Sequence, residues 1–137
     1  MAIQVQTNNQ PINYTVSGPI GNGSITKQKL AAPTNLTVTP GTNVTLTTND
    51  IYQSGYVVNI NARIQITGDI SGGGTILSGL PKGAGSHSYQ LQFYVVNYAS
   101  GATPHRLFFK GNTGELGTVS ALSNGADLRV TFTYISE

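Results

Sequence analysis

Strict alternation of apolar and polar residues constrains the fold of this chain more than any other feature. Over residues 58–66, five apolar side chains alternate with Asn59, Asn61, Arg63 and Gln65. A period of two sustained over nine residues is typical of a β-strand with one buried face and one face in water. Residues 128–134 alternate in the same way. The sequence therefore predicts two strands, each with one face in the core.

A third strand is predicted over residues 89–96. One side of it carries four apolar side chains: Tyr89, Leu91, Phe93 and Val95. The other side begins with glutamines and turns apolar at Tyr94 and Val96. A strand that is apolar on both sides is usually covered on both faces. We therefore expect this strand to be covered on both faces towards its end.

Turn residues divide the remaining sequence into shorter strands. Pro40-Gly41 separates residues 36–38 from residues 44–46, and this pattern predicts a hairpin. A second hairpin is predicted for residues 105–110 and 115–121, which flank Gly111-Asn112-Thr113-Gly114. Several short strands with regular turn signals favour an all-β fold, an antiparallel β-sandwich or jelly roll.

The chain divides at about residue 32. Residues 1–32 have weak periodicity, and only residues 24–32 could form a short helix, with Ser24 as its N-cap. We expect residues 1–32 to be an extended N-terminal arm and residues 33–137 to be the β-sandwich head domain. The arm is apolar and β-prone, and a lone hairpin is marginal in water. It must pack on its own domain or on a copy of itself.

Composition excludes several functional classes. Only 9% of the residues are charged, against about 25% in typical domains, and 11 Ser, 17 Thr and 12 Asn supply polarity instead. The absence of Cys rules out disulfides and thiolate zinc sites. No apolar run approaches the ~20 residues of a membrane helix, and we expect neither membrane insertion nor a signal peptide. The net charge of +2 is scattered, with only Lys27 and Lys29 close together, so we expect no nucleic-acid partner.

Catalytic and metal-binding motifs are missing from the sequence. His87 and His105 are the only histidines, and no GxSxG or HExxH motif occurs. Asp50 and Asp69 could offer oxygen ligands to calcium, but such residues in turns usually cap their own backbone. We expect no enzyme activity, no metal and no cofactor. A carboxylate pair for glycoside hydrolysis, which would meet only in the fold, stays open as an alternative.

Saccharide binding fits the polar-aromatic character of the loops. Proteins meet sugars with planar side chains and with Asn or Asp hydrogen bonds. The strongest cluster is Asn97-Tyr98, followed by a short loop and then His105-Arg106. We predict Tyr98, His105 and Arg106 as saccharide-binding residues.

Two further residues, Tyr52 and His87, lie in segments that could converge with this cluster, and we predict them as second choices. The alternative for any single tyrosine is a place in the core or in an interface with only its phenol tip in water.

Three segments form an ordered series: residues 75–96, residues 105–120 and residues 127–135. The first contains the turn Leu80-Pro81-Lys82-Gly83, the second the hairpin motif Gly114-Glu115-Leu116, and the last ends in Tyr134-Ile135. This series resembles the C-terminal head domains of receptor-binding, tail-fibre or baseplate proteins of tailed bacteriophages, especially those of Gram-positive hosts. The resemblance covers roughly residues 25–137, and a long shoulder or coiled-coil stem is missing from the pattern.

The resemblance implies a homotrimeric head that binds host cell-wall polysaccharide in the virion, at the tail tip or baseplate, beside other phage tail or baseplate proteins. It assigns no individual sugar-contacting residue. Low charge and abundant β-branched strands also suit a rigid particle component. The alternatives are a structural fibre or decoration subunit without receptor binding and a stand-alone lectin-like protein.

Overall fold

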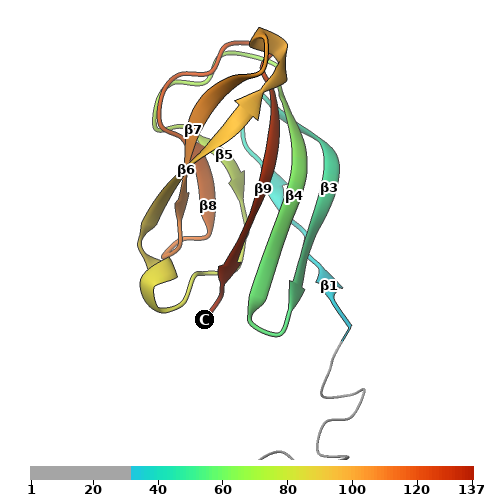
Figure 1. Ribbon diagram of the computed structural model, residues 1–137, viewed down its shortest axis with the longest axis vertical. Coiled ribbons are helices and arrows are strands. Elements are labelled where there is room, and N and C mark those ends of the chain that lie inside the picture. The colour runs from blue at the N-terminus through green and yellow to red at the C-terminus, as the bar shows by residue number, and fades with distance from the viewer. Residues whose placement is uncertain (1–31) are drawn as a thin grey trace, which may run out of the picture. The chain divides into compact units, whose positions relative to one another are not determined.

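Antiparallel strands build almost all of the described chain. The computed structural model describes residues 32–137 (Figure 1), so the expected arm and nearly all of the expected helix over 24–32 lie outside the described residues. The nine strands are β1 (Thr34–Asn35), β2 (Thr39–Pro40), β3 (Val44–Ser54), β4 (Val57–Ile66), β5 (Thr75–Ser78), β6 (Gln90–Asn97), β7 (Thr103–Lys110), β8 (Glu115–Thr118) and β9 (Asp127–Ile135). Two 3-10 turns, η1 (Gly85–Ser88) and η2 (Tyr98–Ser100), flank β6. The all-β antiparallel prediction is confirmed.

A single sheet curls over itself to form the two layers. Its strand order is β1-β3-β4-β9-β6-β7-β8-β5-β2. One layer runs from β1 to β9 and the other from β6 to β2, and Figure 1 shows the two groups facing each other. The layers are joined through β9 and β6, which pair only at Arg129 with Val96 and at Leu128 with Asn97.

The two most regular strand predictions are confirmed. In β4 the apolar residues from Val58 to Ile66 are buried, and the polar residues between them are half-buried or exposed. β9 pairs with β4 over nine residues, from Gln65 with Asp127 to Val57 with Ile135. Both strands contribute their apolar faces to the space between the layers.

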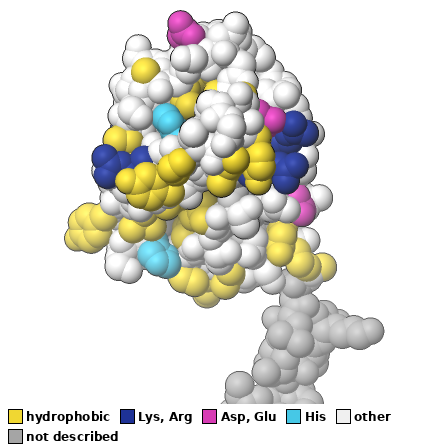
Figure 2. All heavy atoms as spheres, turned by 45° about the horizontal axis from the view of Figure 1, so that its top comes forward, with side chains coloured by type: hydrophobic (Ala, Val, Ile, Leu, Met, Phe, Trp, Pro, Cys, Tyr) yellow, Lys and Arg dark blue, Asp and Glu magenta, His cyan; other side chains and the backbone are white. Residues whose placement is uncertain are grey.

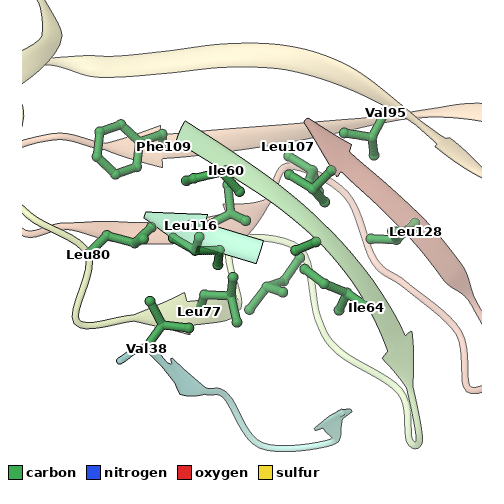
Figure 3. Close-up of a cluster of buried hydrophobic side chains, with 14 of the residues drawn as sticks. Val38, Ile60, Ile64, Leu77, Leu80, Val95, Leu107, Phe109, Leu116 and Leu128 are labelled. Carbon is green, nitrogen blue, oxygen red and sulfur yellow. The ribbon is translucent and has the colours of Figure 1, made fainter. Parts of the chain in front are cut away.

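The core fills that space with aliphatic and aromatic side chains from both layers (Figure 3). Ile60, Ile64 and Leu128 come from the first layer, and Leu107 and Leu116 come from the second. An aromatic group continues the core, with ring centroids 4.4–5.8 Å apart. Its members are Phe93, Phe109, Phe132 and Tyr134.

One hairpin prediction is confirmed and the other is wrong. β7 and β8 pair from Leu107 with Thr118 to Lys110 with Glu115, as expected. The turn after Pro40 does reverse the chain, since Val44 N donates to Gly41 O, but the strands on its two sides do not pair. β2 pairs with β5, whereas β3 pairs with β1 and β4. The chain crosses between layers at this turn, because β2 lies beside β5 in one layer and β3 lies beside β4 in the other.

The expected cover over both faces of β6 is absent among the described residues. Tyr94 is 68% exposed on the outer side, and Val96 is only half-buried. Tyr89, which we expected to begin the apolar side of this strand, precedes β6 and is 74% exposed. Alternation correctly predicted that Leu91, Phe93 and Val95 face the core. The apolar residues on the other side of the strand, Tyr94 and Val96, are not buried by the described residues.

Residues 75–96 and residues 127–135, the first and last of the three segments singled out in the sequence, touch each other. The hydroxyl of buried Tyr134 donates to Pro81 O over 2.6 Å. Ala84 N donates to Ile135 O, and Gly83 pairs with Ser136 in an isolated bridge. These contacts hold the Leu80–Gly83 turn against the end of β9.

Candidate functional site

A shallow depression of about 440 Å³ lies at the end of the sandwich where η2 meets the segment before β9. Figure 2 brings this end forward and shows few charged side chains at its top, hydrophobic patches below, and the basic side chains gathered at the two sides. The lining residues come from the end of β6, from η2, from β7 and from the segment before β9: Asn97, Ala99, Ser100, His105, Ala121, Leu122, Ser123, Asn124, Gly125 and Ala126. His105 is the only ionisable side chain in this lining.

The β6–β7 connection shapes one wall of the depression. Asn97 caps η2, because its Oδ1 accepts from Ala99 N over 3.2 Å. Gly101 and Ala102 then both adopt left-handed backbone conformations, with φ of 73° and 60°, and this reverses the chain into β7. Ser100 Oγ lies 2.7 Å from Thr103 Oγ1 and ties the two sides of the connection together.

His105 stands at the inner edge of the depression, half-buried on β7. Its Nε2 lies 2.6 Å from Thr118 Oγ1, and the same hydroxyl donates to Ser120 O over 2.5 Å. Burial lowers the pKa of His105, and the Ser120 carbonyl opposes this shift only in part. The imidazole is therefore neutral at pH 7 and fixed in orientation by Thr118.

Within residues 32–137, the Asn97 side chain is hydrogen-bonded only through its carbonyl oxygen. Besides capping η2, Asn97 Oδ1 accepts from Asp127 N over 3.1 Å. The side chain thereby links β6 to the start of β9, next to the short pairing that joins the two layers.

Tyr98 belongs to this end of the molecule, but its ring is not part of the lining. The ring is 53% exposed and lies beneath the guanidinium of Arg129, whose Cζ is 5.6 Å from the ring centroid. Arg129 is directly opposite Arg63 on β4, and Asp127 pairs with Arg63 through contacts of 2.6 and 2.9 Å. Tyr98 and Asp127 together stabilise two adjacent arginines.

Arg106 points to the other side of the sheet. It follows His105 on β7, so the two side chains leave opposite faces of the strand. On its face Arg106 is paired across strands with the exposed Tyr94. The structure therefore separates His105 from Arg106, which the sequence had placed in one cluster.

Tyr52 and His87 lie at the opposite end of the sandwich. The depression adjoins Asp127 at the start of β9, whereas His87 Nδ1 accepts from Ile135 N at the end of that strand. Tyr52 pairs with Asn59, which in turn pairs with Thr133 near the same end. A nine-residue strand spans about 30 Å, so neither residue converges with His105.

Four of the ten lining residues lie in the 97–106 cluster predicted from the sequence, and the other six lie in residues 121–126, which were not predicted. The segment of residues 121–126 carried only the turn signal Asn124-Gly125 and no planar side chain. Thr118, which orients His105, could not be predicted either, because nothing in the sequence distinguishes it from the other 16 threonines. Asn97 stood out only as the neighbour of Tyr98.

No group of three or more His, Asp or Glu side chains that could hold a metal ion occurs within residues 32–137. Over the same residues, no helix is long and apolar enough to cross a membrane. No family model matches the sequence, and no curated protein matches it.

Proposed function

We propose that this chain is a non-catalytic adhesion module of a phage or prophage virion, which binds host cell-surface saccharide as a homotrimer. The observation that carries the proposal is the depression of about 440 Å³, lined by amide, hydroxyl and imidazole groups at the end of a rigid β-sandwich. Sugars present many hydroxyl groups, and such a lining offers donors and acceptors to them without a charged group to desolvate.

The hydrogen bonds of His105 support binding rather than hydrolysis. Its Nε2 is committed to Thr118, whose hydroxyl proton is committed to Ser120 O, so this pair does not present a free nucleophile with its base. No carboxylate lines the depression among the described residues. Glycoside hydrolysis by the usual route would require two.

A shallow, polar site implies weak binding by each copy. Several copies held on one particle raise the overall affinity through effective concentration, without any new contact. The homotrimer and the place at a tail tip or baseplate rest on the resemblance to phage head domains. Light scattering on the full chain would measure the mass of the assembly directly.

A glycan array and a host cell-wall pull-down test the saccharide site. Ser123→Trp should fill the depression and abolish retention, because Ser123 is an exposed lining residue. Ser86→Trp is the matched control, since Ser86 is an exposed serine in η1 at the opposite end of the sandwich. Equal retention of both variants would refute the assignment of the site.

The alternative, a structural virion subunit, is favoured by one observation. Four tyrosines on the described surface are more than half exposed: Tyr56, Tyr89, Tyr94 and Tyr98. Tyrosine is enriched in protein interfaces. A stable trimer that retains no glycan on the array would support this alternative, and a monomer that retains glycan would support a stand-alone lectin.

A further inference from the structure

The hydrogen-bond network around His105 fixes which ring nitrogen carries the proton. A hydroxyl has one hydrogen, and that of Thr118 is used towards Ser120 O. Thr118 Oγ1 can therefore only accept from His105 Nε2, at 2.6 Å. The proton of the neutral ring is on Nε2, and Nδ1 is an unprotonated acceptor.

The hydrogen bonds of Asn97 fix the orientation of its amide and leave a donor where His105 leaves an acceptor. Its Oδ1 accepts two backbone N–H groups, from Ala99 and from Asp127. A carbonyl oxygen has two lone pairs, so its accepting capacity is used. The Nδ2 group donates to no residue in the part of the chain from 32 to 137, and it remains a donor for a ligand.

The strand register brings this acceptor and this donor together. Val95 pairs with His105, and Asn97 is two residues further along β6 on the same face. Diagonal neighbours of this kind are about 7–8 Å apart between backbones, within reach of one another's side chains. Both residues line the depression.

We propose that the depression recognises a vicinal diol of a neutral sugar, with His105 Nδ1 accepting from one hydroxyl and Asn97 Nδ2 donating to its neighbour. This inference rests on the saccharide-binding function proposed above and names its ligand class. A carboxylate or phosphate is disfavoured at this position, because it would face the Nδ1 lone pair and find no cationic side chain in the lining.

Binding should then depend on the protonation of His105. A proton on Nδ1 converts the acceptor into a donor and removes the first hydrogen bond. The residues that face His105 across its two neighbouring strands, Val95 on β6 and Thr118 on β8, are not ionisable. The nearby carboxylates are engaged elsewhere: Asp69 accepts from Asn124 N, and Asp127 pairs with Arg63.

Two measurements on the full chain test the inference. In the first, 15N chemical shifts of the imidazole in the ligand-free protein report the tautomer; we expect Nε2–H, and an Nδ1–H ring would overturn the proposal. In the second, methyl α-mannopyranoside, methyl β-galactopyranoside and sodium glucuronate are titrated in turn. We expect binding of at least one neutral glycoside, with affinity falling as the pH is lowered through the pKa of His105, which burial places below the usual value for histidine. Tighter binding of glucuronate, or no pH dependence, would contradict the ligand class.

Isosteric variants locate the contact. His105→Gln can keep a donor near the Nε2 position but has no group at Nδ1, so affinity should fall by about tenfold or more. His105→Asn retains an acceptor at the Nδ1 position and should bind more tightly than His105→Gln. Asn97→Asp keeps the cap of η2, removes the donor and should also lose binding. Thermal unfolding of each variant verifies that it is folded.

The outcomes separate this inference from the proposed function. Loss of saccharide retention in Ser123→Trp together with unchanged binding by His105→Gln would leave the saccharide site in place. It would overturn the proposal that His105 binds a vicinal diol there. Absence of any saccharide retention by the wild-type chain would overturn both.

Discussion

The hydrogen bond between Tyr134 and Pro81 allows one sharp prediction about stability. Tyr134→Phe removes the hydroxyl that donates to Pro81 O over 2.6 Å and leaves the buried ring against Phe109, with centroids 4.4 Å apart. The Pro81 carbonyl then loses its donor in a partly buried place. We expect the free energy of unfolding to fall by about 1–2 kcal/mol, in the lower part of the range for an unpaired buried acceptor.

Urea denaturation followed by far-UV circular dichroism measures this change. The midpoint should fall while the slope with urea stays constant, because the native state loses one contact but not its compactness. Tyr94→Phe is the matched control: Tyr94 is 68% exposed, and a surface substitution of this kind should change stability by less than about 0.5 kcal/mol. Equal midpoints for the wild type and Tyr134→Phe would refute the role of the hydroxyl.

The same hydroxyl predicts a loss of stability at alkaline pH. Burial raises the pKa of the Tyr134 phenol in the folded state. Above pH of about 10, the unfolded chain loses this proton while the folded chain retains it, so stability falls by up to about 1.4 kcal/mol per pH unit. Tyr134→Phe should lack this contribution, and an unchanged alkaline slope in the variant would assign the effect to another group.

Three further predictions concern the sandwich itself. Phe109→Ala should cost about 3–5 kcal/mol in urea denaturation, because the ring is fully buried within the aromatic group, and a loss below about 1 kcal/mol would contradict that packing. Gly117→Ala should be destabilising, with altered aromatic NMR shifts for Phe108, since an added Cβ would meet the Phe108 ring and the Gly74 carbonyl; a neutral effect would show that the ring moves freely. Asp127→Asn should be less stable than the wild type at pH 7, because Arg63 lowers the pKa of this carboxyl. The difference should disappear as the pH falls through that lowered pKa, and a difference that persists in acid would point to packing instead.

The parts of the fold that could be predicted from the sequence are those decided by local periodicity. β4 and β9 alternate without interruption, and each buries one face as a direct consequence. The prediction of a hairpin over residues 36–46 was wrong because a turn specifies that the chain changes direction but not which strand pairs with which. β2 has only two residues, and it is held beside β5 in its own layer, where Gly41 N also donates to Ile76 O. No local pattern encodes that contact.

The candidate site was predictable only in part, for a similar reason. Asn97 and His105 are close because they lie on the neighbouring strands β6 and β7, and the sequence analysis had grouped them only as a cluster around a short loop. Arg106 was grouped with them by adjacency, although adjacent strand residues point to opposite faces. The placement of Tyr52 and His87 depends on how the layers stack, which is a property of the whole sheet.

The short pairing between β6 and β9 has a mechanical consequence. Only two residue pairs connect the layers by backbone there, and the side chain of Asn97 adds a further link to Asp127 N. Asn97 therefore links the two layers of the curled sheet and also forms part of the wall of the depression. In the adhesion module proposed above, a ligand that immobilises Asn97 would tighten this link between the layers, so the domain would be stiffer with the site filled than with the site empty.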